Sequence, residues 1–146
     1  MAKVTQSIVV ACDGSEQSLK AAKMAASLAK ATAQPLKMLA VFPASEIEKM
    51  AVTRVWSGDV EEEVNEFRRK VFSAAREAVS GTAEPTDEIL LKGDPAHQIV
   101  DYLKANPGTH LVLGRRGHSA LTSLTLGSVS EKVVRHATGP VTVVSD

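Results

Sequence analysis

Glycines and hydroxyl side chains gather in one segment near the C-terminal end of the chain. Gly114–Gly117 follows a short apolar run, and Gly127-Ser128-Val129-Ser130 comes after nine further residues. Glycines let backbone N–H groups approach an anion closely. The start of a helix adds unpaired N–H groups and the positive end of a dipole. With the hydroxyls of Ser128 and Ser130 as further donors, this segment predicts a phosphate-binding site.

The same residues also have an explanation that needs no ligand. Ser128 at the N-cap and Glu131 three residues later form the pattern of a capping box. Glycines in loops often serve turns alone. The segment is not a Walker A loop, because no Lys precedes Ser128, and it is not the dinucleotide pattern G-x-G-x-x-G. From the residues alone, both explanations remain open.

Composition excludes several classes of function. The chain has 146 residues, with 17 basic and 17 acidic side chains, so we expect neither nucleic acid nor an anionic membrane as its main partner. The single cysteine, Cys12, excludes a disulfide framework, and we expect it to be a buried apolar residue rather than a reactive thiol. The four histidines lack a metal-binding spacing. The polar N-terminus is unlike a signal peptide, so we expect one cytoplasmic domain over residues 1–146.

The elements that must position the glycine segment follow from hydrophobic patterning. Short continuous apolar runs predict strands buried on both faces of a parallel sheet, at residues 8–11, 36–42, 89–91, 111–113 and 141–144. Helical patterns alternate with them, at residues 16–32, 60–80, 95–105 and from 128 onward. This alternation predicts a three-layer α/β sandwich. We expect Pro43–Asp59 and Arg115–Gly127 to be long loops at the strand carboxyl ends, where such sheets bind ligands.

Three sequence blocks in order resemble the universal stress protein family, and in particular its ATP-binding subfamily. They are Val9–Ser15 at the first strand and its D-G-S turn, Lys92–Ala96 at the exit of the third strand, and Gly114–Asp146, which contains the G-x2-G-x9-G-S spacing and Gly139-Pro140-Val141. The resemblance covers essentially the whole chain. It implies a flavodoxin- or Rossmann-like fold with a five-stranded parallel sheet in the order 3-2-1-4-5. It also implies an adenine nucleotide, ATP or AMP, with Mg²⁺ accompanying a triphosphate.

The resemblance assigns a contact to each matching residue. The implied contacts are Asp13 with the ribose or adenine, Val41 with the adenine through its backbone, Gly114, Arg116 and Gly117 with the ribose and first phosphate, and Gly127, Ser128, Val129 and Ser130 with the phosphates. Asp13 has a competing interpretation, in which it caps the Gly14 turn or the first helix. We also expect that a side chain in place of Gly127 would occupy the approach of the phosphates.

The implied function is a stress-response regulator whose conformation or dimer surface depends on bound nucleotide. Phosphates are expected to order the segment Arg115–Gly127, and a second copy is expected to pair through the strand Val141–Val144. The sequence does not name the regulatory protein partner. Two alternatives are a slow ATP hydrolase, for which the Walker lysine and paired carboxylates are missing, and a structural dimer without nucleotide.

Overall fold

Helices and strands alternate along almost the whole chain. The computed structural model describes residues 5–52, 57–116 and 126–145. In chain order the elements are β1 (Ser7–Ala11), α1 (Glu16–Thr32), β2 (Leu36–Pro43), α2 (Ala44–Val52), α3 (Ser57–Val79), β3 (Pro85–Gly93), α4 (Pro95–Ala105), β4 (Thr109–Gly114), α5 (Ser128–His136) and β5 (Val141–Val144). None of the helices within these ranges is long and apolar enough to cross a membrane.

The strands form one parallel sheet in the order β3-β2-β1-β4-β5, as predicted. β1 is the central strand, and its Val9 pairs with Lys37 on β2 and with Leu111 on β4. Ile8, Val9 and Val10 are fully buried, because helices cover both faces of the sheet. Such a strand has no solvent side, which explains its uninterrupted apolar sequence.

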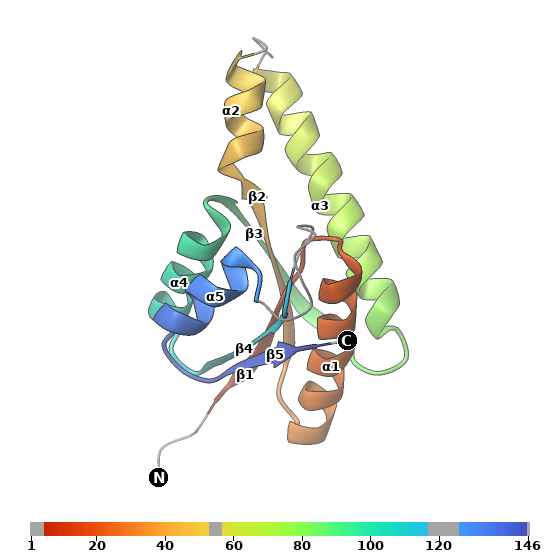
Figure 1. Ribbon diagram of the computed structural model, residues 1–146. Coiled ribbons are helices and arrows are strands. Elements are labelled where there is room, and N and C mark those ends of the chain that lie inside the picture. The colour runs from red at the N-terminus through yellow and green to blue at the C-terminus, as the bar shows by residue number, and fades with distance from the viewer. Residues whose placement is uncertain (1–4, 53–56, 117–125, 146) are drawn as a thin grey trace.

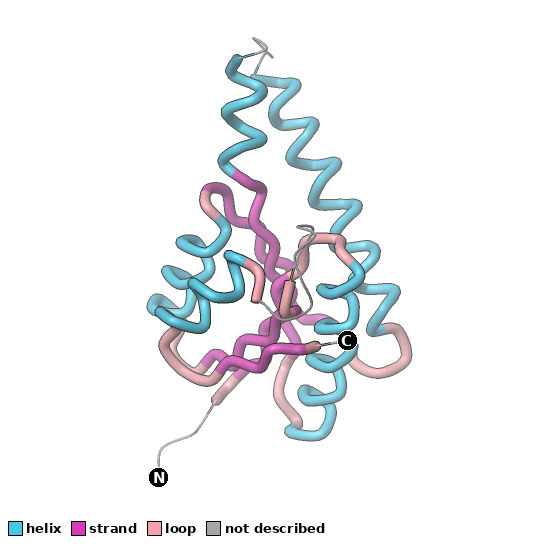
Figure 2. Tube along the Cα trace, in the orientation of Figure 1, coloured by secondary structure: helices cyan, strands magenta, loops and turns pink. Residues whose placement is uncertain are grey.

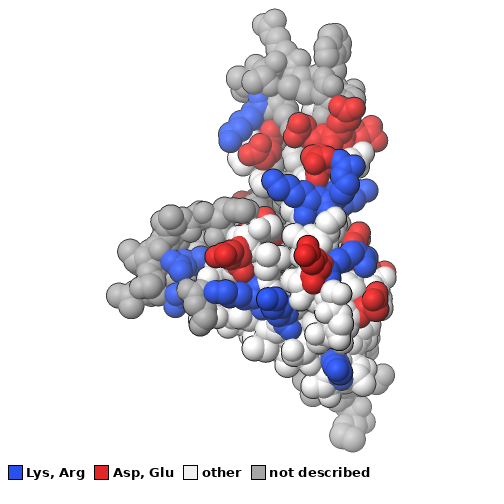
Figure 3. Space-filling view, turned by 90° about the vertical axis from the view of Figure 1, so that its right-hand side faces the viewer, with Lys and Arg blue, Asp and Glu red and all other residues white. Residues whose placement is uncertain are grey.

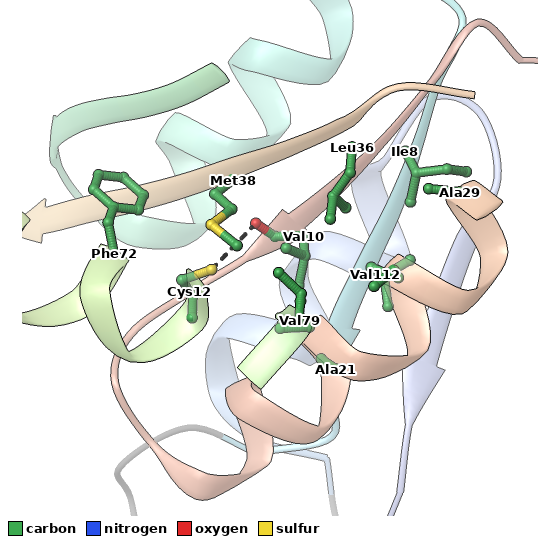
Figure 4. Close-up of a cluster of buried hydrophobic side chains, with 14 of the residues drawn as sticks. Ile8, Val10, Cys12, Ala21, Ala29, Leu36, Met38, Phe72, Val79 and Val112 are labelled. Carbon is green, nitrogen blue, oxygen red and sulfur yellow. Dashed lines mark hydrogen bonds between the residues drawn. The ribbon is translucent and has the colours of Figure 1, made fainter. Parts of the chain in front are cut away.

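Figure 1 shows α1 and α3 on one face of the sheet and α4 and α5 on the other, and Figure 2 shows the strands between these helices. The predicted three-layer sandwich is therefore confirmed. α1 lies close to the sheet because its inward face consists mainly of small residues, Ala21, Ala22, Ala25, Ala26 and Ala29. Figure 4 shows the core that this helix forms with α3 and the strands, including Met38, Phe72 and Val112.

The structure corrects two predicted boundaries. Most of the expected loop Pro43–Asp59 is helical, since α2 starts directly after β2 and α3 already begins at Ser57. The loop was predicted as the connection between the apolar run 36–42 and the helical pattern from residue 60, but Pro43 and Gly58 lie next to or within the first turns of helices, where proline and glycine are tolerated. β3 is longer than the predicted run of residues 89–91. It is an edge strand, and its first half is polar and exposed, so hydrophobicity did not indicate it.

α2 and the first part of α3 stand above the carboxyl edge of the sheet (Figure 1). We call these residues, 44–52 and 57–70, the arm. Figure 3 shows acidic side chains gathered on the arm, with basic side chains directly below them. Within residues 60–70, the part of the arm on α3 whose exposure is described, the exposed acidic residues are Glu61, Glu62, Glu63 and Glu66. The arm therefore adds a charged wall beside the edge where ligands are expected.

Candidate functional site

A cavity of about 710 Å³ opens at the carboxyl ends of β1, β2 and β4. Chain order reverses here, because β2 and β3 extend to one side of β1 while β4 and β5 extend to the other. Open α/β sheets bind ligands at such a switch point. Small-molecule sites usually measure roughly 300–1,000 Å³, so this cavity has the size of a ligand site.

The fold brings the sequence candidates together around this cavity. Eight of the nine line it, namely Asp13, Val41, Gly114, Arg116, Gly127, Ser128, Val129 and Ser130. The ninth, Gly117, lies outside the described residues, as do residues 117–125 of the segment Arg115–Gly127 that is expected to become ordered on phosphate binding. The cavity thus combines residues from β1, β2, β4 and α5 that are more than a hundred positions apart in the chain.

The start of α5 forms the donor-rich wall of the cavity. Gly127 is the N-cap residue, and no side chain caps the helix. The expected capping box with Ser128 at the N-cap is therefore wrong, because Ser128 is already the first helical residue and its side chain is exposed. The first N–H groups of a helix have no acceptor within it. The amides of Ser128, Val129 and Ser130 are accordingly donors at the cavity wall.

Gly127 itself plays a backbone role. Its N–H donates to the carbonyl of Arg115 over 2.9 Å, which joins the start of α5 to the segment after β4. A Cβ added at Gly127 would lie 3.2 Å from the Cα of Arg116 and 3.5 Å from the carbonyl oxygen of Arg115. The expectation that a larger side chain here would fill the phosphate approach stays a prediction, but the Cβ itself has a nearer neighbour. That Cβ would press on the backbone of residues 115 and 116.

Ser130 and Gly114 hold β4 against the neighbouring helices. The buried hydroxyl of Ser130 donates to the carbonyl of Gly114 over 2.8 Å. A Cβ added at Gly114 would lie 2.9 Å from both the Cβ and the carbonyl oxygen of Gln17 on α1. Gly114 is thus required for close packing of α1 on β4. The hydroxyl proton of Ser130 is committed within the protein, and its backbone N–H is the group left for a ligand.

Asp13 caps the turn between β1 and α1. Its Oδ1 accepts from the N–H of Ser15 at 2.9 Å and from the hydroxyl of Ser15 at 2.5 Å. Ser15 is in turn the N-cap of α1 and accepts from the N–H of Ser18 at 3.2 Å. The capping interpretation of Asp13 is therefore confirmed by these contacts. Asp13 is also one of the residues that line the cavity.

The arm supplies a wall that sequence reasoning missed. It contributes Ser45, Glu46, Glu63, Glu66, Phe67 and Lys70 to the cavity lining. Glu46 pairs with Lys49 at 3.4 Å, and Glu66 pairs with Arg69, both on exposed positions. These residues were missed because the chain of α2 was expected to be part of the loop Pro43–Asp59 and because no local pattern shows that α3 reaches the cavity. The apolar helical spacing that included Phe67 was the available signal.

Cys12 is a buried residue in the lining of the cavity. Its thiol donates to the carbonyl of Val10 at 3.7 Å (Figure 4). Burial, followed by the nearby charge of Asp13, raises the pKa of Cys12 from 9.0 to about 12. The expectation of a buried thiol is therefore confirmed, and its low reactivity stays a prediction. Within the described parts of the chain, no group of three or more His, Cys, Asp or Glu side chains is placed to hold a metal ion.

Fold and site together define a flavodoxin-like α/β protein with a ligand cavity at the switch point of its sheet. The model of the universal stress protein family matches residues 5–145. Universal stress protein YxiE of Bacillus subtilis is 32% identical over 94% of this chain and 97% of its own length. Universal stress protein MJ0531 of Methanocaldococcus jannaschii is 34% identical over 94% of this chain and 80% of its own length. The chain therefore belongs to the universal stress protein family.

Solved structures share the fold over nearly the whole chain. The protein MJ0577 superposes with a TM-score of 0.80 at 21% identity, covering 99% of this chain and 98% of that one. A universal stress protein in complex with cAMP has a TM-score of 0.68 at 24% identity, covering 98% of both chains. The universal stress protein of Archaeoglobus fulgidus in complex with dAMP has a TM-score of 0.61 at 24% identity, covering 97% of this chain and 98% of its own.

Proposed function

We propose that this protein is a cytoplasmic stress-response regulator that binds an adenine nucleotide of the ATP or AMP type in the 710 Å³ cavity. One observation carries the proposal: α5 begins in the wall of this cavity with no side chain capping it. Three backbone amides and the positive end of the helix dipole are thus available to an anion. A phosphate group matches both features.

Positive charge favours binding of the ligand's phosphates at the end of the cavity where α5 begins. Arg116 lines the cavity, and its backbone lies next to Gly127 at the start of α5. Its guanidinium is permanently charged and suits phosphate oxygens. The backbone amides of Ser128, Val129 and Ser130 supply the remaining donors. A Mg²⁺ ion accompanying ATP would be held by the phosphates, because the described residues offer it no carboxylate cluster.

The remaining length of the cavity suits a ribose and a base. Asp13 lies at the end of β1, beside the phosphate end, and its carboxylate is an acceptor for ribose hydroxyls. Further along, the lining becomes apolar through Leu39, Val41 and Ile99. A flat, weakly hydrated base matches an apolar wall. Similar folds in complex with cAMP and dAMP support an adenine nucleotide as the ligand.

The regulatory part of the proposal concerns the surface of the protein. β5 is an edge strand whose residues Val141–Val144 are only half-buried. An apolar edge of this kind is suited to pair with a second copy of the chain. α5 carries the phosphate donors, and β5 is the next element in the chain. Nucleotide binding at α5 can therefore affect the dimer surface at β5. A regulatory protein partner would respond to that surface.

Calorimetry with AMP, ATP and cAMP tests the proposal, and a proline substitution localises the phosphates. Ser128→Pro removes one amide donor at the first helical position, where proline fits, and Gly127 before it is already extended. Ser128→Ala is the matched control, because it keeps the amide and removes only the hydroxyl. We expect Ser128→Pro to weaken AMP binding by roughly tenfold with an unchanged Tm, about the contribution of one hydrogen bond to a charged group. If the native protein, Ser128→Pro and Ser128→Ala bind AMP with equal affinity, the phosphate assignment is refuted.

A further inference from the structure

We propose that Phe67 on α3 determines the base specificity of the nucleotide cavity and selects purines over pyrimidines. This inference rests on the proposed function and extends it to an element, the arm, that none of the sequence candidates includes. It follows from the direction in which the cavity runs, from the aromatic pair at its far end, and from the charges around that pair.

The direction of the cavity follows from the strand order. The phosphate donors of α5 lie at the end of β4, where Ser130 is bonded to Gly114. β1 separates β4 from β2 in the sheet. The cavity lining continues from Gly114 through Asp13 at the end of β1 to Val41 and Phe42 on β2. A nucleotide whose phosphates bind at α5 therefore extends its base toward the end of β2.

An aromatic pair forms the wall at that end. The rings of Phe42 and Phe67 meet edge to face, with centroids 5.3 Å apart and an interplanar angle of 83°. Phe42 is 3% exposed, so its ring is fixed within the core, whereas Phe67 is only partly buried. Both side chains line the cavity. Phe67 is thus held in place by Phe42 and leaves part of its ring surface for a ligand.

Charge around the pair favours the base over the phosphates. Glu63 and Glu66 lie on the same helix as Phe67 and also line the cavity, and Glu46 adds a third carboxylate from α2. Lys70, one turn further along α3, is the basic lining residue of the arm. With Glu46 paired to Lys49 and Glu66 to Arg69, the three lining carboxylates and one lining cation still make this end less favourable for phosphate than the start of α5. The same carboxylates can accept from an exocyclic amine, such as that of adenine.

The size of the base then decides the affinity. A purine has two fused rings, so it covers more of an apolar wall than a pyrimidine does, and affinity grows with the apolar area removed from water. Because Phe67 belongs to the arm, a large base also connects the sheet edge to the arm. The arm therefore carries the part of the site that distinguishes one nucleotide from another.

The test compares AMP, CMP and ribose 5-phosphate in calorimetric titrations of the full chain. AMP and CMP share the phosphate, the ribose and an exocyclic amine, and differ in base size, whereas ribose 5-phosphate has no base. For the native protein we expect AMP to bind roughly tenfold more tightly than CMP, because the larger base removes more apolar area from water. Phe67→Ala should weaken AMP by a similar factor, change CMP less, and leave ribose 5-phosphate unchanged.

Two further variants control for folding. Phe67→Leu keeps apolar bulk and should retain most of the preference for AMP. Val64→Ala truncates a buried residue of the same helix that does not line the cavity. It should lower the Tm and preserve the ratio of AMP to CMP affinity. An unchanged ratio in Phe67→Ala, or an equal loss for all three ligands, would overturn the role of Phe67. If the native protein binds neither AMP nor ribose 5-phosphate, the proposed function itself fails.

Discussion

The hydroxyl of Ser130 on α5 donates a 2.8 Å hydrogen bond to the carbonyl of Gly114, the last residue of β4. Both residues line the cavity. This bond fixes the start of α5 to the sheet, so the amides of Ser128 and Val129 keep a defined position relative to the strand ends. Preorganised donors of this kind bind an anion without further ordering of the protein.

Replacing Ser130 separates this structural bond from direct ligand contact. Ser130→Ala leaves the Gly114 carbonyl without its donor in a buried place, which costs about 1–3 kcal/mol of stability. Ser128→Ala removes an exposed hydroxyl that caps nothing, so its stability should change by less than about 0.5 kcal/mol. Urea denaturation of both variants measures the difference. Equal stabilities would show that the bond between α5 and β4 is unimportant.

Gly114 is predicted to tolerate no side chain. The Cβ of Gly114→Ala would lie 2.9 Å from the carbonyl oxygen of Gln17, and neither the backbone of α1 nor that of β4 yields easily. Overpacking of this kind typically costs about 1–3 kcal/mol. Thermal unfolding should show a lower Tm for Gly114→Ala.

Gly81→Ala serves as the comparison for Gly114→Ala. Its Cβ would meet nothing within 4 Å, and only its φ of +86° opposes an alanine. The cost there is purely conformational, about 1 kcal/mol. A Gly114→Ala protein that is as stable as the native protein would contradict the close packing of α1 on β4.

Cys12 should react only after unfolding. Its pKa of about 12 means that the folded protein holds the neutral thiol at pH 8, whereas the unfolded chain begins to form the reactive thiolate near its ordinary value of 9.0. A disulfide reagent at pH 8 should therefore label the protein slowly in buffer and rapidly in concentrated urea. Between pH 9 and 12 the unfolded state loses this proton first, so stability falls as pH rises. Rapid labelling of the folded protein would contradict the burial of Cys12.

His110 should make the fold sensitive to mild acid. Its Nε2 lies 2.7 Å from the hydroxyl of Thr142 on the edge strand β5, and burial lowers its pKa below 6.5. The unfolded chain therefore binds a proton at a higher pH than the folded chain does. Stability should fall as pH drops below 6.5 toward the folded pKa. Between pH 7.5 and about 5.5 we expect the Tm of His110→Gln to decrease less than the Tm of the native protein does. The control His136→Gln changes a residue at the exposed end of α5, and its Tm should decrease as much as that of the native protein.

The sheet was predictable because burial on both faces leaves a simple signal. Runs such as Ile8–Ala11 and Leu111–Leu113 contain no polar alternation, and they proved to be strands. β3 was underestimated because Asp87 and Glu88 lie on an exposed edge, where the strand is defined by pairing with β2 and not by hydrophobicity. α2 was missed because a short helix after a proline carries little periodic signal.

The candidate site, like the fold, was predictable from the sequence only in part. The spacing of Gly114, Gly127 and Ser128 indicated the right part of the fold, but it did not reveal which glycine serves packing. That distinction depends on Gln17 of α1, which no local pattern connects to Gly114. The arm residue Phe67 depends in the same way on tertiary contact, since its partner Phe42 lies on a different element.

The most direct test of the central claim is an NMR titration of the ¹⁵N-labelled protein with AMP. If the phosphate binds at the start of α5, the backbone amides of Ser128, Val129 and Ser130 should show the largest shifts, and ribose 5-phosphate should reproduce them. The claim is contradicted if these three amides stay unmoved while AMP binds elsewhere, or if millimolar AMP, ATP and cAMP shift no amide at all.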